Sequence, residues 1–223
     1  MPYLHAMSFT EIWHQFIDNI RQTSLLEFIG VSAGVASVWF SRKENILVYP
    51  VGLVNTIIYI YISIKGSLFG EASVNLYYTI MSIYGWWLWA RRDERKQVLL
   101  HISYSTKKEW VVQLLFFATF YAGIYVALTY LNNAFDSKAI PWADAFASST
   151  AYTGMWLMAR KKIESWYWWI ATNIASIPLY FVKGYAFTSV QYILLLVLAF
   201  MGLFSWIQKQ NAAVSTQTIY ARD

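Results

Sequence analysis

Seven long apolar stretches dominate the chain, and polar or charged segments separate them. The stretches are Leu25–Phe40, Ile46–Ile64, Ala72–Ala90, Trp110–Leu131, Trp142–Ala159, Trp166–Val182 and Ser189–Ile207. Each is close to the roughly 17–25 residues that a helix needs to cross the hydrocarbon core of a bilayer. Hydrophobic residues make up 58% of the chain and charged residues 13%, against about 45–50% and about 25% in soluble domains. The pattern predicts an all-α polytopic membrane protein with seven transmembrane helices.

A shorter amphipathic pattern precedes the first apolar stretch. Ser8 and Glu11 have the spacing of a capping box, and Ile12, Phe16 and Ile20 fall on one face of a helix. The segment lacks the basic start and the small-residue cleavage site of a signal peptide. We therefore expect residues 1–23 to form a helix that lies on the membrane surface.

The distribution of lysine and arginine predicts the orientation. One set of connections carries thirteen of the seventeen basic residues, and the opposite set carries Arg21, Lys65, Lys138 and Lys183. Cytoplasmic connections of membrane proteins carry the excess of lysine and arginine. The N-terminus is therefore expected outside and the C-terminus in the cytoplasm.

The first three and the last three stretches resemble copies of one another. An offset of 117 or 118 positions pairs Glu27 with Asp144, Trp39 with Trp156, Asn55 with Asn173, Gly85 with Gly202 and Trp89 with Trp206. Three helices per copy is an odd number, so the fourth stretch is needed to give both copies the same direction. The sequence thus predicts two parallel three-helix repeats joined by a linker helix, which is one of the plans of membrane transporters. The predicted organisation is a surface helix (1–23), a first repeat (24–92), a cytoplasmic loop with the linker helix (93–140), a second repeat (141–208) and a cytoplasmic tail (209–223).

A few polar side chains lie inside the apolar stretches, where they are costly and therefore informative. Amides and aromatic residues share helix faces in both repeats, and the candidate substrate-binding residues are Asn55, Tyr59, Asn75, Tyr78, Trp169, Asn173 and Gln191. Such side chains can hydrogen-bond and stack on a neutral or cationic polar ligand. The alternative is that the amides bond neighbouring helices and hold the bundle together.

Other chemistry finds little support. Glu27 and Asp144 near the outer helix ends are read as anchors between helix ends, with proton relay or acid–base work as alternatives. All three histidines lie outside the stretches, the chain has no cysteine, and no nucleophile motif is present. We therefore expect no catalytic residues, no metal site and no cofactor. The basic residues lie between the membrane spans, so we expect membrane lipid and no nucleic acid as a partner.

These residues resemble one known family. The two parallel repeats, the Trp169-x-x-x-Asn173 motif and the run from Ser82 to Trp87 are similar to the PnuC vitamin transporters, relatives of the sugar-carrying SWEET proteins. In the first repeat Val51 stands where the second has Trp169, so a role of that tryptophan carries over to one repeat only. The resemblance implies facilitated diffusion of nicotinamide riboside across a bacterial inner membrane, trapping by a cytoplasmic kinase, and a homotrimer. Related members carry thiamine or riboflavin.

The residues add a constraint on the substrate and on the energy source. The predicted spans contain no lysine or arginine, so two phosphate charges would lose their hydration without a cationic partner. An unphosphorylated ligand with a cationic ring, such as nicotinamide riboside or thiamine, fits better. No acidic residue lies near the midplane, which favours uniport by alternating access without ion coupling. The alternative of another class is a seven-helix sensor or assembly protein.

Overall fold

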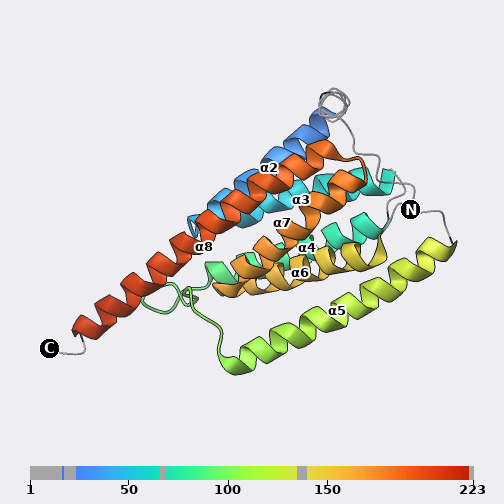
Figure 1. The fold of residues 1–223 in the computed structure, drawn as a ribbon. Helices are drawn as coiled ribbons and strands as arrows, with labels where there is room; N and C mark the ends of the chain where they lie inside the picture. The colour runs from blue at the N-terminus through green and yellow to red at the C-terminus, as the bar shows by residue number, and fades with distance from the viewer. Residues whose placement is uncertain (1–16, 18–23, 66–68, 135–139, 221–223) are drawn as a thin grey trace.

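The computed structural model describes residues 17, 24–65, 69–134 and 140–220, which form seven long helices. They are α2 (Leu25–Arg42), α3 (Val48–Lys65), α4 (Phe69–Ala90), α5 (Lys107–Ala134), α6 (Pro141–Ala159), α7 (Glu164–Val182) and α8 (Ala186–Tyr220) (Figure 1). Each contains most or all of one predicted apolar stretch, so the seven-helix prediction is confirmed. Apart from Ile17, the predicted surface helix lies outside the described residues.

The helices differ in how apolar they are. By length and composition, α2, α3, α5 and α8 could cross a membrane on their own. Helix α6 carries many serine, threonine and alanine residues, and most of its length is buried against neighbouring helices. Its polar hydroxyls bond within the protein, as in the pair of Thr172 and Thr150 with Oγ1 atoms 3.0 Å apart. Small polar residues of this kind let transmembrane helices approach closely.

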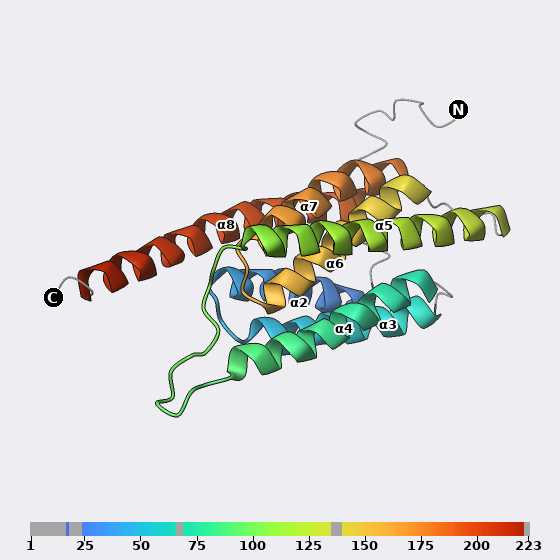
Figure 2. The same ribbon diagram turned by 90° about the horizontal axis from the view of Figure 1, so that it is seen from below.

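Helix α8 is longer than its apolar stretch. The predicted span ends at Ile207, whereas the helix continues to Tyr220 and projects beyond the other helices (Figures 1 and 2). After Gly202 the sequence holds neither glycine nor proline before the end of the helix, and residues such as Ala212 and Ala213 favour a helix. The first part of the predicted cytoplasmic tail is therefore helical.

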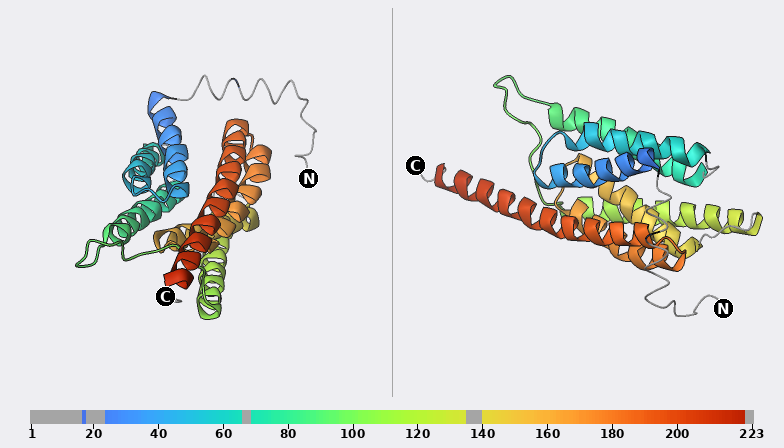
Figure 3. Two further views of the ribbon diagram at one scale, coloured as in Figure 1. Left: turned by 90° about the vertical axis from the view of Figure 1, so that its left-hand side faces the viewer. Right: turned by 90° about the horizontal axis from the view of Figure 1, so that it is seen from above.

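The helices form two rows of three. In the first row α3 packs between α2 and α4, and in the second α7 packs between α6 and α8. The rows face each other, with α2 against α8 and α4 against α6 (Figure 3). Thus the first helix of each row packs against the third helix of the other. This reciprocal arrangement is what two parallel repeats around a two-fold pseudosymmetry axis should give.

Matching hydrogen bonds join the rows. The indole N–H of Trp89 donates to the carbonyl of Ala159 at 3.2 Å, and that of Trp206 donates to the carbonyl of Ser41 at 3.0 Å. Each bond runs from the third helix of one repeat to the end of the first helix of the other. The donors are 117 positions apart and the acceptors 118, so the offset found in the sequence relates real contacts.

In each row one glycine makes room for a bulky ring. The ring of Tyr49 lies where a Cβ atom on Gly85 would stand, 2.5 Å from its nearest atom, and Trp166 does the same at Gly202 with 2.4 Å. Tyr49 meets Trp89 edge-on with ring centroids 5.2 Å apart, and Trp166 meets Trp206 with centroids 5.5 Å apart. These aromatic contacts form the buried core at the end of the bundle where the basic connections gather.

Helix α5 and the connection before it fasten to the second repeat. The backbone N–H and the hydroxyl of Ser105 both donate to the carboxylate of Glu164 at 2.8 Å, and the amide of Gln113 donates to the Ser105 hydroxyl. The indole of Trp168 in turn donates to Gln113. The linker is therefore attached mainly to the second repeat.

Replacing either close-packed glycine by alanine should destabilise the protein. Gly85→Ala and Gly202→Ala each force a methyl group into a ring that is rigid and buried, which typically costs about 1–3 kcal/mol. The measurement is the temperature at which half of the detergent-purified protein is lost from the monodisperse peak in size-exclusion chromatography. Gly123→Ala in α5 is the control, because nothing lies within 4 Å of the position that its new Cβ atom would occupy. Equal midpoints for all three variants would contradict the packing described here.

Candidate functional site

An aromatic cluster lies between the two repeats, about midway along the helices. It consists of Tyr77 and Tyr78 from α4, Tyr152 from α6 and Trp169 from α7. The rings of Tyr77 and Tyr152 have centroids 4.3 Å apart, and those of Tyr78 and Trp169 are 6.3 Å apart. The hydroxyl of Tyr77 donates to the carbonyl of Tyr152 at 3.0 Å. We call this group the inter-repeat aromatic cluster, and it contains two of the predicted site residues.

Several of the predicted site residues have no hydrogen-bond partner among the residues that the structure describes. Asn173 lies one helical turn beyond Trp169 and is only 3% exposed. In the part of the chain that the structure describes, we find no hydrogen-bond partner for the side chains of Asn173, Gln191, Tyr59 or Tyr78. The amide atoms of Asn173 are not among the fully buried, unpartnered side-chain atoms of the described residues, so they keep some accessible surface. Asn173 therefore has free hydrogen-bonding capacity that a ligand could use.

The first-repeat amides are engaged differently. The amide nitrogen of Asn55 donates to the carbonyl of Gly30 at 2.7 Å and lies against Gly34. It thereby ties α3 to α2. The amide nitrogen of Asn75 donates to the carbonyl of Glu71 one turn earlier in its own helix, at 2.9 Å. The two halves of the predicted site are therefore unequal, with the free amide on the second repeat.

Three tyrosines near this site were not predicted from the sequence. Tyr77 and Tyr152 form the closest ring pair across the repeats, and Tyr192 stacks on Tyr180 with centroids 5.2 Å apart. Tyr192 also lies near Tyr59 and Tyr78. The offset of 117 pairs Tyr77 and Tyr152 with leucine and valine, so the repeat carried no signal for them. For these two only their polarity within apolar stretches was a signal, whereas Tyr192 is the counterpart of the predicted residue Asn75 at the same offset.

At the end opposite the basic connections, Asp144 fastens two helix ends. Its carboxylate accepts the backbone N–H of Ile140 at 2.7 Å and forms an ion pair with Lys183 at the end of α7. Its counterpart Glu27 stands in the first turn of α2, where its backbone N–H bonds the capping hydroxyl of Ser24. Asp144 thus has the anchoring arrangement, with both carboxylate oxygens in use.

The basic end holds an unusual pair of helix termini. Helices α2 and α6 both end in a Schellman motif, in which the N–H of Glu44 bonds the carbonyl of Ser41 and the N–H of Lys161 bonds that of Met158. Glu44 and Lys161 have φ angles of 59° and 51°. This left-handed conformation favours glycine and costs other residues about 1–2 kcal/mol. Both repeats therefore keep a charged residue where glycine would be less strained.

The charges of these two residues meet. The ammonium of Lys161 lies 2.7 Å from one carboxylate oxygen of Glu44, and that of Lys209 lies 3.1 Å from the other. Burial opposes the ionisation of Glu44, but hydrogen bonds from the two lysines and their charges outweigh it, so the pKa of Glu44 is lowered. The Glu44 carboxylate is therefore charged at neutral pH.

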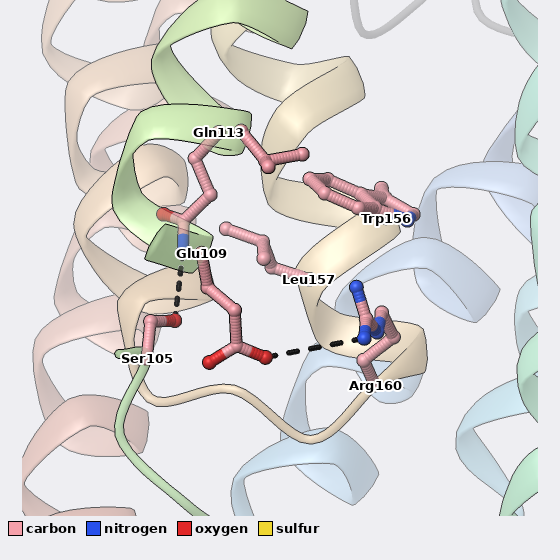
Figure 4. Close-up of a pocket in the computed structure, with 7 residues that line it drawn as sticks. Ser105, Glu109, Gln113, Trp156, Leu157 and Arg160 are labelled. Carbon is pink, nitrogen blue, oxygen red and sulfur yellow. Dashed lines mark hydrogen bonds and ion pairs between the residues drawn. The ribbon is translucent and has the colours of Figure 1, made fainter. Parts of the chain in front are cut away.

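Two hollows lie away from the inter-repeat aromatic cluster. A pocket of about 240 Å³ between α5 and α6 is lined by Ser105, Glu109, Gln113, Trp156 and Arg160 among others, and Figure 4 shows that its polar groups bond one another. Glu109 pairs there with Arg160 and Lys162. An apolar groove of about 570 Å³ runs between α2 and α8, lined by residues such as Val35 and Leu194. Neither contains any of the predicted site residues.

Comparison with known proteins identifies the family of the chain. Residues 24–208 match the model of a family described as the nicotinamide mononucleotide transporter. The nicotinamide riboside transporter PnuC of Escherichia coli (strain K12) is 24% identical over 204 residues, covering 82% of this chain and 85% of that protein. The riboflavin/roseoflavin transporter RibM of Streptomyces davaonensis is 24% identical over 182 residues, covering 81% and 83%.

A solved structure agrees with the fold. It is described as the crystal structure of the vitamin B3 transporter PnuC, and it superposes with a TM-score of 0.67 at 21% identity. The match covers 88% of this chain and 87% of the other. The prediction of an all-α membrane protein of this family is confirmed.

Proposed function

Because the chain belongs to the nicotinamide mononucleotide transporter family, we propose that it takes up nicotinamide riboside by facilitated diffusion. The observation that carries this proposal is the site between the repeats, where the free amide of Asn173 lies one turn from Trp169 and the inter-repeat aromatic cluster. Transporters built from two repeats hold their substrates at the repeat interface near the midplane. The relatives named above are described as transporters of nicotinamide riboside and of riboflavin, which are flat, polar vitamins. Aromatic rings and an amide at the site can stack on such a ring and hydrogen-bond its polar groups.

The site chemistry favours the riboside over the mononucleotide of the family name. A cationic pyridinium ring can lie against the aromatic rings of Tyr78 and Trp169. Ribose hydroxyls can bond the amides of Asn173 and Gln191. No lysine or arginine lies in the predicted spans, so a phosphate group would be buried without a cation to compensate the loss of hydration.

The transport cycle that we propose is uncoupled. The carboxylate of Asp144 is held by Lys183 and a backbone N–H, so it is not free to carry a proton or an ion between the two sides. The repeats would rock around the site and expose it alternately to the two sides. Accumulation would then depend on a separate enzyme that modifies the vitamin inside the cell.

The setting that we propose is a homotrimer in a bacterial inner membrane, with the N-terminus outside. The excess of lysine and arginine on the connections at one end supports this orientation. Exposed residues at the two ends test it, since the chain lacks cysteine. In intact cells a membrane-impermeant maleimide should label Tyr185→Cys and leave Glu94→Cys unlabelled; the reverse result would invert the topology.

Uptake into proteoliposomes tests the function. With no ion gradient and no membrane voltage, labelled nicotinamide riboside should equilibrate to equal concentrations on both sides, because only its own gradient drives the movement. Unlabelled nicotinamide riboside should compete, and thiamine and riboflavin are the comparison competitors. Accumulation above the outside concentration under an imposed pH or sodium gradient would contradict uniport. Stronger competition by thiamine or riboflavin would reassign the substrate.

Replacing the free amide tests the site. Asn173→Leu should weaken nicotinamide riboside binding about tenfold to a hundredfold, since a hydrogen bond to a buried ligand contributes on the order of 1–3 kcal/mol. The measurement is the dissociation constant of the purified protein by isothermal titration calorimetry. Trp169→Ala should be at least as damaging, because it removes the ring on which the pyridinium lies.

The neighbouring Thr172 gives a matched control. It is 4% exposed and bonds Thr150 and the carbonyl of Trp168, so Thr172→Val removes a buried hydrogen bond that no ligand uses. We expect Thr172→Val to lower the thermal stability and to keep the affinity of the parent. A folded Asn173→Leu protein that binds like the parent would show that Asn173 joins helices instead.

A further inference from the structure

Two contacts in the structure join residues to their own repeat counterparts. The hydroxyl of Ser41 donates to the sulfur of Met158 at 2.9 Å, and Lys161 bonds Glu44 at 2.7 Å. Both pairs are 117 positions apart, which is the offset that relates the repeats. In a two-fold arrangement a residue can touch its own counterpart only where the axis passes between them. The pseudosymmetry axis therefore leaves the basic end of the molecule between Glu44 and Lys161.

Bonds between the repeats gather around this point. The hydroxyl of Ser205 and the indole of Trp206 reach the last carbonyls of α2, and the ammonium of Lys209 bonds the carbonyl of Lys43. The ammonium of Lys161 also lies 4.7 Å from the ring centroid of Trp89 in the other repeat. Its side chain is only 4% exposed. The Glu44 side chain is 24% exposed, so the contact is a partly buried ion pair across the axis whose lysine is shielded from solvent.

The backbone supports a role beyond fastening. Glu44 and Lys161 both hold the left-handed conformation that glycine would adopt more readily. Strained positions of this kind gather at switches and functional sites. Here the two strained residues are each other's counterparts, carry opposite charges and face one another. A seal made of two charges can reopen, because water that enters between separating repeats hydrates both groups.

We propose that Glu44 and Lys161 are the gating residues that close the basic end of the transport pathway, and that their separation opens the inter-repeat site to that side. This inference rests on the proposed function, because a gate implies that the protein is a transporter. Lys209 supplies Glu44 with a second partner from α8, the last helix of the repeat that contains Lys161. Opening the gate therefore requires that α8 moves away from the end of α2 together with the α6–α7 connection.

A single cysteine on the axis reports the state of the gate. Ser41→Cys places a thiol of nearly the parent size behind the pair, at a position that is 3% exposed, in a chain with no other cysteine. In nanodiscs the reaction of this thiol with a small water-soluble maleimide should be slow in the parent background. Adding Glu44→Gly should accelerate the reaction at least tenfold, because it removes the charge and relieves the backbone strain without disturbing the helix end.

Exchanging the two charges of the pair, and mutating a second ion pair at the same end as a control, make the test specific. In a Lys209→Gln background, Glu44→Lys should accelerate labelling, and Glu44→Lys combined with Lys161→Glu should return it toward the parent rate. Glu109→Gln is the control, since Glu109 pairs with Lys162 at 2.9 Å at the same end but within the linker and the second repeat. Parent-like labelling of folded Glu44→Gly, or equal acceleration by Glu109→Gln, would overturn the proposal. Glu44→Gln replaces Glu44→Gly in every arm should the glycine variant not fold.

Uptake separates this proposal from the proposed function. Glu44→Gly should slow nicotinamide riboside uptake at least fivefold, while Glu109→Gln should transport like the parent. Faster labelling of Glu44→Gly in a protein whose parent carries no nicotinamide riboside would leave the gate standing and reject the substrate. Normal uptake by Glu44→Gly with unchanged labelling would reject the gate and leave the substrate standing.

Discussion

The pseudosymmetry axis between the repeats is the constraint on which the other features depend. Each repeat is a flat row of three helices, and a row can bury its inner face only against the other row. The indoles of Trp89 and Trp206 fix this pairing, because each donates to the first helix of the opposite repeat. Close packing against Gly85 and Gly202 keeps each row rigid. The rows are therefore two tightly packed units, or bodies, whose mutual contacts run between α2 and α8 and between α4 and α6 along the line where the rows meet.

This geometry explains where chemistry can occur. Side chains midway along the line face both bodies at once, and there the structure places the inter-repeat aromatic cluster, with Asn173 one helical turn from its member Trp169. Side chains at the basic end of the line meet their own counterparts, as Glu44 and Lys161 do. In the proposed cycle, a ligand at the middle and the ion pair at the end would favour different relative positions of the two bodies, as alternating access requires.

Much of this architecture could be predicted from the sequence, and some of it could not. The apolar stretches gave seven helices because the bilayer leaves a backbone few other choices, and the offset of 117 predicted matching contacts such as those of Trp89 and Trp206. Single residues were harder. Asn55 and Asn173 are counterparts, yet Asn55 bonds Gly30 while Asn173 has no partner among the described residues. Tyr152 has only Val35 as its counterpart, so neither symmetry nor a motif marked it. Such differences depend on which neighbour each helix meets, which no periodicity encodes.

The central claim is that the two repeats move as bodies about the site between them, and distances between the repeats at the two ends test it most directly. Pulsed electron paramagnetic resonance can measure one spin-label pair at the basic end, Ala90→Cys with Gln208→Cys, and one at the opposite end, Leu25→Cys with Tyr185→Cys. Adding saturating nicotinamide riboside should shift the two distance distributions in opposite directions. Distributions that stay unchanged, or that widen together at both ends, would contradict alternating access by rocking of the repeats.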